Sequence, residues 1–164
     1  MDLSKKLLKG KKSITPILGS IASGKTSLCT YLAKLFADNG LKVGFTSTQR
    51  STTELHYLVD HPDVRCFFTG NNTIHISSLS NVVEVLFVDF IEFDIRSSHF
   101  ENLHIFCTEQ LPRGVPNDFW SVRPDVFASY FKYETQILLN GYSSNYPSHF
   151  FYKNKNGVEV LTYG

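Results

Sequence analysis

The chain has 164 residues, of which 42% are hydrophobic and 19% charged, and its formal net charge is +1. This length fits one domain, at roughly 100–200 residues per domain, and the composition excludes a disordered chain. The near-neutral charge excludes a strongly cationic module that holds nucleic acid by bulk charge alone. Cys29, Cys66 and Cys107 form no Cys-x-x-Cys pair, which argues against a disulfide framework and a zinc site and favours a reducing compartment.

The first twelve residues contain five lysines but neither an apolar core nor a cleavage site, so they are no signal peptide. We expect residues 1–12 to form a basic, solvated lead-in or a short helix. The alternative is a small basic patch that contacts phosphates. The longest apolar run, around residues 82–90, contains Glu84 and is far shorter than the roughly 20 residues of a spanning helix. The sequence therefore predicts no membrane partner and a cytoplasmic location.

The next segments predict an alternation of strand and helix. Residues 13–18 indicate a short strand that runs into glycine, and apolar residues then recur at helical spacing over residues 28–36. Asp38-Asn39-Gly40 is a typical helix stop. Residues 41–48 indicate a second strand, and a short strand is expected at residues 66–68. Strand, loop, helix and strand make a βαβ unit, which implies a parallel sheet.

The second half of the chain predicts further strands. Two nearly continuous apolar runs, residues 85–89 and 103–108, are typical of buried parallel strands. Residues 125–139 are ambiguous, but their Phe, Tyr and Thr favour a strand. Residues 148–164 predict a β-hairpin around Asn156-Gly157.

One motif carries recognisable chemistry. Gly19-Ser-Ile-Ala-Ser-Gly-Lys-Thr26 matches G-x-x-x-x-G-K-[ST] in full, between a predicted strand and a predicted helix. Gly19 and Gly24 allow backbone conformations that bring successive N–H groups onto a phosphate, and the helix points its positive end at the same anion. Lys25 reaches the β- and γ-phosphates, and the Thr26 hydroxyl is a magnesium ligand. The sequence therefore predicts ATP and Mg²⁺ as cofactors. The expected nucleotide-binding residues are Gly19, Ser20, Ile21, Ala22, Ser23, Gly24, Lys25, Thr26 and Ser27.

Such a site also needs an acid at the end of a buried strand, to hold the magnesium shell. Asp89, which follows Val-Leu-Phe-Val, is predicted to be that residue. Many ATPases carry the catalytic glutamate directly after this aspartate, but here Phe90 follows. We expect Glu92 to be the catalytic base, because alternation along an extended chain places it on the same side as Phe90. The alternative for Glu92 and Asp94 is a solvated strand end.

Polar residues also end the following strand. Gln110 is the best candidate for a sensor that contacts the γ-phosphate or its water, and Thr108 is the next. The alternative is ordinary strand termination before Pro112. Arg113 and Arg123 are candidates for an arginine finger that acts on a neighbouring subunit's nucleotide; the alternative for each is a surface arginine. The predicted catalytic residues are thus Lys25, Glu92 and Gln110.

These segments together resemble a known family. The glycine loop, the strand ending at Asp89, the strand ending Thr108-Glu-Gln-Leu-Pro112 and the downstream Arg123-Pro-Asp125 look like the FtsK–HerA group of P-loop ATPases, in particular the small genome-packaging ATPases of viruses. The resemblance covers roughly residues 13–135. It implies an α/β fold: a RecA/FtsK-like three-layer sandwich with a mainly parallel sheet, to which residues 148–164 add the hairpin. Residues 1–164 would then form a single P-loop NTPase domain.

The resemblance also implies an activity. It implies an ATP-driven motor that works as a homo-oligomeric ring and moves DNA into a preformed capsid, with a capsid or portal component as partner. The protein would then act in the host cytoplasm or in the virion. In this interpretation Lys25 and Thr26 bind nucleotide and magnesium, Asp89 is the acidic-strand residue and Gln110 the sensor.

Two other functions fit parts of the sequence. A nucleoside or nucleotide kinase resembling thymidine kinase shares the loop, the following helix and the small size, although this chain lacks a Cys-x-x-Cys zinc pair and a recognisable Arg-rich lid. A nucleotide-binding module with weak or no hydrolysis is the third reading, and Phe90 in place of the glutamate is its main support.

Overall fold

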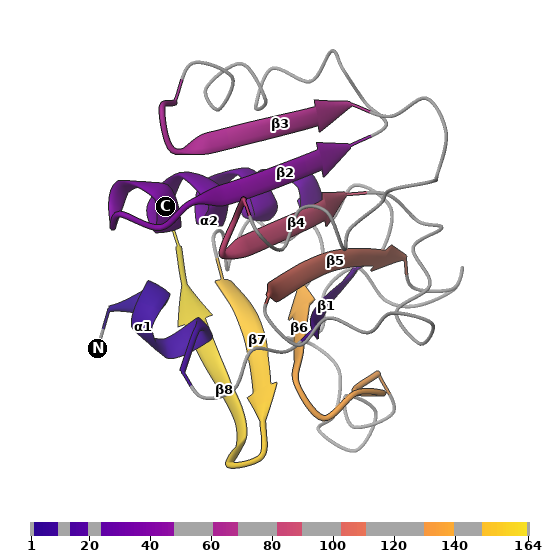
Figure 1. Ribbon diagram of the computed structural model, residues 1–164. Coiled ribbons are helices and arrows are strands. Elements are labelled where there is room, and N and C mark those ends of the chain that lie inside the picture. Colours follow the sequence, from indigo (N-terminus) through magenta and orange to yellow (C-terminus); the bar gives the residue numbers. More distant parts are fainter. Residues whose placement is uncertain are drawn as a thin grey trace.

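The computed structural model describes eight stretches of the chain: residues 2–9, 14–19, 24–47, 61–68, 82–89, 103–110, 130–139 and 149–163. Within them, two helices accompany eight strands that form one sheet (Figure 1). The helices are α1 (Leu3–Leu7) and α2 (Lys25–Asp38). The strands are β1 (Ile14–Gly19), β2 (Val43–Ser47), β3 (Val64–Phe68), β4 (Val85–Asp89), β5 (His104–Gln110), β6 (Gln136–Leu139), β7 (His149–Asn154) and β8 (Gly157–Thr162).

The sheet has the order β3-β2-β4-β5-β1-β6-β7-β8. The first six strands are parallel, and β7 and β8 add antiparallel to one edge. The predictions of a mainly parallel α/β sheet and a C-terminal hairpin are therefore confirmed. Because the strands are parallel, their carboxyl ends meet at one edge: Gly19 pairs with Gln110, and Ser47 with Asp89. The described helices cover one face of the sheet, so the described residues do not test the third layer of the predicted three-layer sandwich.

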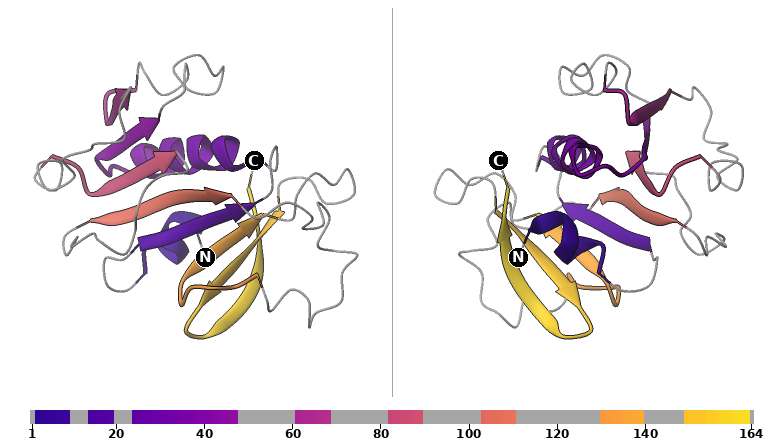
Figure 2. Two further views of the ribbon diagram at one scale, coloured as in Figure 1. Left: turned by 90° about the vertical axis from the view of Figure 1, so that its right-hand side faces the viewer. Right: turned by 60° about the vertical axis from the view of Figure 1, so that its left-hand side comes forward.

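Helix α2 covers one face of the sheet because one of its faces is continuously apolar. Leu28, Leu32 and Phe36 recur every four residues and are fully buried. The Phe87 ring lies 5.8 Å from that of Phe36 and 5.1 Å from that of Phe106, measured between centroids. The sheet curves around α2, which lies on its concave side (Figure 2). None of the helices that the structure describes is long and apolar enough to span a membrane.

The N-terminal segment forms the short helix that was one of the two expectations. The Asp2 carboxylate caps α1 by accepting from the Ser4 N–H at 2.9 Å. Leu7 is buried in the same core as α2, so α1 packs against the protein. Lys6 forms an ion pair of 2.8 Å with Glu159 of β8, which joins the two ends of the described chain.

The expected strand over residues 125–139 is wrong for residues 130–135, and residues 125–129 lie outside the described part. The fully buried side chain of Gln136 explains the difference. Its Oε1 accepts from the N–H groups of Lys132 and Tyr133, at 2.9 and 3.2 Å, and its Nε2 donates to the Tyr130 carbonyl at 2.9 Å. One amide thus satisfies the backbone groups that a longer strand would pair.

The hairpin turn lies one residue before the predicted position. Asn154 pairs with Gly157, so Lys155 and Asn156 form the two-residue loop. The Asn154 side chain accepts from the Asn156 N–H at 2.9 Å, and Gly157 has a φ of 122°. An asparagine side chain that folds back onto the backbone fixes the turn here, and glycine supplies the left-handed residue that follows.

The stacked phenylalanines predict a large stability effect. Replacing fully buried Phe87 by Ala is expected to lower the free energy of unfolding by about 3–5 kcal/mol, because a cavity is left beneath α2. Urea or guanidinium titration measures this change. Val158, which is 51% exposed on β8, is the control, and its change to Ala should cost about 0.5 kcal/mol or less. Equal costs for the two variants would contradict this picture of the core.

Candidate functional site

The carboxyl-terminal edge of the sheet gathers residues that are distant in the sequence. β1 ends at Gly19, where the glycine-rich motif begins, and α2 starts at Lys25, where the motif ends. β5 lies between β1 and β4, so α2 reaches across β5 to the end of β4. Thr26 and Asp89 are 63 positions apart in the chain and are in direct contact. The edge thus joins the glycine motif to the acidic strand.

Gly24 shapes the beginning of α2. It occupies the N-cap position with a φ of 93°, in the left-handed region, and no side chain caps the helix there. The Gly24 carbonyl accepts the first helical hydrogen bond, from the Leu28 N–H at 2.9 Å. A residue with a Cβ would be strained in this conformation. The first N–H groups of any helix have no acceptor within the helix, so a helix start of this kind attracts an anion.

Lys25 brings a positive charge back over the glycine motif. Its Nζ donates to the Gly19 carbonyl at 3.1 Å, so the side chain spans the loop from the helix to the end of β1. Burial lowers the pKa of the Lys25 ammonium, and the negative charge of Asp89 offsets part of this effect. A partly desolvated cation gains more from a nearby anion than a cation in water does. The position therefore suits a multiply charged anion.

The Asp89 carboxylate is held by two hydroxyl groups. Thr26 Oγ1 donates to Oδ2 at 2.8 Å, and Thr108 Oγ1 donates to Oδ1 at 3.3 Å. Thr26 and Asp89 are both partly buried. Hydroxyl and carboxylate oxygens are the ligands that a small hard cation takes. The pair therefore fits Mg²⁺ in donor chemistry, and the second hydroxyl fixes the orientation of the carboxylate.

Most predicted residues in the described part lie at this edge. Gly19, Gly24, Lys25 and Thr26 are the described members of the motif, and Asp89 lies against Thr26. The Gln110 backbone pairs with Gly19, which places the end of β5 beside the start of the motif. Ser27 is exposed in the first turn of α2. Outside the described residues lie Ser20, Ile21, Ala22, Ser23, Phe90, Glu92, Asp94, Arg113 and Arg123.

The sequence ranked Thr108 behind Gln110, yet the structure shows Thr108 on the carboxylate. Alternation along β5 sends the next residue, Glu109, to the opposite face of the sheet. There the Glu109 carboxylate accepts from the Tyr133 hydroxyl at 2.7 Å. The Glu109 side chain therefore lies away from Asp89. Of the two neighbouring residues Thr108 and Glu109, Thr108 is the one that contacts the acid. The sequence did contain a signal for Thr108, because Thr108 and Gln110 are polar residues two positions apart at the end of one strand and therefore share a face of the sheet.

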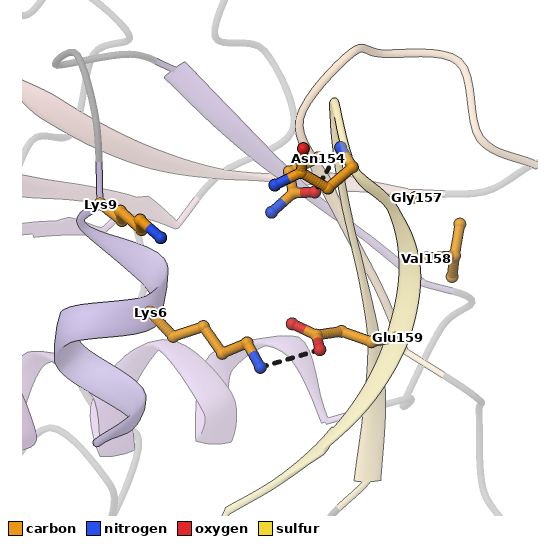
Figure 3. Close-up of a pocket in the computed structure, with 7 residues that line it drawn as sticks. Lys6, Lys9, Asn154, Gly157, Val158 and Glu159 are labelled. Carbon is orange, nitrogen blue, oxygen red and sulfur yellow. Dashed lines mark hydrogen bonds and ion pairs between the residues drawn. The ribbon is translucent and has the colours of Figure 1, made fainter. Parts of the chain in front are cut away.

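A shallow groove of about 400 Å³ lies elsewhere, between α1 and the turn of the hairpin. Figure 3 shows Lys6 and Lys9 on one side and Asn154 and Glu159 on the other, with the Lys6–Glu159 ion pair spanning the gap. Its lining residues come from α1, from Lys9 just after it and from the β7–β8 hairpin, and none belongs to the group around Asp89. Because Glu159 neutralises Lys6, the groove has a weaker positive charge than its lysines alone suggest.

Comparison with known proteins gives matches among solved structures. No family model and no curated protein matches the chain. The ATPase domain of G40P superposes with a TM-score of 0.63 at 12% identity, over 93% of this chain and 81% of that one. The genome packaging NTPase B204 from Sulfolobus turreted icosahedral virus 2, in complex with sulfate, gives 0.53 at 13% identity, over 93% and 97%. The flagellar accessory protein FlaH from Methanocaldococcus jannaschii gives 0.50 at 17% identity, over 100% and 85%.

At these identities the likeness establishes the fold. The chain has the fold of the P-loop ATPases, so the predicted fold class is confirmed. This agrees with the placement of the glycine motif between β1 and α2, which is the context that the motif requires.

The charges of the site predict a titration effect. Replacing Asp89 by Asn should lower the pKa of Lys25, because it removes the negative charge that opposes the effect of burial. NMR titration of lysine side chains labelled at Cε measures this pKa. Asp38, an exposed carboxylate in the last turn of α2, is the control, and Asp38→Asn should leave the pKa of Lys25 unchanged. A rise on removing Asp89 would contradict the proposed proximity of the two charges.

Proposed function

We propose that the protein binds and hydrolyses ATP and uses the energy to move DNA, as a genome-packaging motor does. One observation carries the proposal: the 2.8 Å hydrogen bond from Thr26 to Asp89, which joins the last residue of the glycine motif to the acidic strand. In a P-loop enzyme these two positions hold the magnesium that accompanies the nucleotide. A fortuitous glycine-rich turn would give no reason for such a partner.

The phosphate chain would lie on the glycine motif. Residues 19–27 would supply backbone N–H groups, and the start of α2 would supply a partial positive charge. The Lys25 ammonium, which bridges to Gly19, would turn to the β- and γ-phosphate oxygens. Partial burial strengthens this interaction relative to water.

Thr26 and Asp89 would hold Mg²⁺, which supplies charge neutralisation on the β- and γ-phosphates. Thr108 keeps the carboxylate oriented through its bond to Oδ1. We further propose Glu92 as the base that aligns the attacking water and Gln110 as the sensor. The assignment of Glu92 rests on the sequence argument alone, and the pairing of the Gln110 backbone with Gly19 supports that of Gln110.

The motor function rests on two supports. One is the resemblance of the sequence to the FtsK–HerA group, and the other is the similarity of the fold to a protein described as a genome packaging NTPase. Complexes of that protein with AMP and with ATP-gammaS are among the matching structures. We propose that this chain assembles as a homo-oligomeric ring, in which core loops repeated around the ring contact DNA, with a capsid or portal component as partner.

The decisive experiment measures ATP hydrolysis with and without duplex DNA. We expect DNA to stimulate hydrolysis and Lys25→Ala to lower the rate by about a hundredfold or more, because the main cation on the phosphates is lost. Lys34→Ala is the matched control: Lys34 is an exposed lysine of the same helix and pairs with Asp38. This variant should retain the wild-type rate.

The same assay separates the alternatives. Phosphate transfer to thymidine or another nucleoside, without an effect of DNA, would replace the motor by a kinase. Nucleotide binding without measurable hydrolysis would leave a binding module. A strictly monomeric mass in the presence of ATP and DNA would contradict the ring.

The left-handed glycines give an independent test of the loop. Gly24→Ala and Gly40→Ala should each lower the free energy of unfolding by about 1–2 kcal/mol, because alanine is strained at their φ values of 93° and 88°. Gly24→Ala alone should weaken ATP binding, since Gly40 lies at the other end of α2. Calorimetric titration with ATP, together with chemical denaturation, compares the two. Equal ATP affinity in both variants would remove Gly24 from the site.

A further inference from the structure

The C-terminal strand brings a tyrosine to the beginning of α2. Tyr163 directly follows β8, and its hydroxyl lies 3.9 Å from the position that a Cβ on Gly24 would occupy. This is ordinary van der Waals distance from the N-cap of the helix. Figure 2 shows the C-terminal end of the chain beside one end of α2 (left view). The residue that follows the last strand therefore borders the glycine motif.

Aromatic contacts fix the position of the Tyr163 ring. Its centroid lies 5.6 Å from that of Tyr31 in α2, at an interplanar angle of 50°, and 5.8 Å from that of Phe150 in β7, at 53°. Contacts of this geometry are favourable for aromatic pairs. The ring is thus held between helix and hairpin, and the hydroxyl is the part that reaches Gly24.

The hydroxyl is a donor without a protein acceptor among the residues that the structure describes. Burial raises the pKa of Tyr163, so the phenol stays protonated at neutral and mildly alkaline pH. The hydroxyl is not among the fully buried polar atoms that lack a partner, so it is accessible to a ligand. Next to a loop that attracts an anion, a hydrogen bond to that anion is stronger than a neutral one.

We infer that Tyr163 is a phosphate-binding residue, whose hydroxyl donates to a non-bridging phosphate oxygen of the nucleotide beside Gly24. The inference rests on the proposed function for the identity of the anion. It assigns a binding role to the C-terminal hairpin, which places a fourth kind of group at the site beside the loop amides, the lysine and the magnesium pair.

The test compares two variants that each remove one hydroxyl from the same aromatic cluster. Tyr163→Phe should weaken the binding of both ATP and inorganic tripolyphosphate by about tenfold, the usual effect of one hydrogen bond to a charged group. Tyr31→Phe, which makes the same chemical change in the partner ring, should leave both affinities unchanged. Isothermal titration calorimetry measures the affinities, and thermal unfolding of both variants verifies that the cluster remains packed.

Several results would overturn the inference. Unchanged affinity of Tyr163→Phe for both ligands overturns it while the proposed function stands. A loss for ATP with none for tripolyphosphate overturns the phosphate contact, since the hydroxyl would then contact the ribose or the base. If the wild-type protein binds neither ligand, the proposed function fails and the inference fails with it.

Discussion

The hydrogen bond between Thr26 and Asp89 is the contact on which the arrangement of the site depends. It closes only if β5 separates β1 from β4 and α2 crosses β5 at the right height. The phenylalanines set that height, because Phe36 packs against both rings of the stacked pair Phe87 and Phe106. A change of register in β4 by one residue would turn Asp89 to the other face of the sheet. The packing of the core and the geometry of the site therefore depend on each other.

The same contact has an electrostatic cost. Lys25 and Asp89 are both partly withdrawn from water, and the pKa of Lys25 is lowered by that burial. Partly buried charges destabilise a fold unless hydrogen bonds or counter-charges compensate them. The protein supplies such bonds to each group: the Gly19 carbonyl to Lys25, and the hydroxyls of Thr26 and Thr108 to Asp89. These bonds compensate the burial of the two charges. A bound anion beside Lys25 and a hard cation beside Asp89 would compensate it further.

The sequence predicted what local pattern determines. Continuous apolar runs indicated β4 and β5, and the glycine motif indicated the junction of β1 with α2. Contacts that depend on tertiary structure escaped it: the amide of Gln136, which keeps residues 130–135 out of β6, and the bond from the Thr108 hydroxyl to Asp89, although Thr108 was the second-ranked candidate at this strand end. Tyr163 gave no signal, because its neighbour Gly24 is distant along the chain and only the antiparallel addition of β7 and β8 brings them together.

The hairpin therefore does more than extend the sheet. Its two strands add to the edge beyond β6, and the curvature of the sheet carries β8 back over the face that α2 covers. Side chains of β8 and of the residue after it then meet both helices: Glu159 pairs with Lys6 of α1, while Tyr163 packs on Tyr31 of α2. Tyr31 lies in the helix that carries Lys25 and Thr26 in its first turn, and Phe150 lies in β7. The packing of the hairpin against α2 is thus connected to the start of that helix through one aromatic cluster.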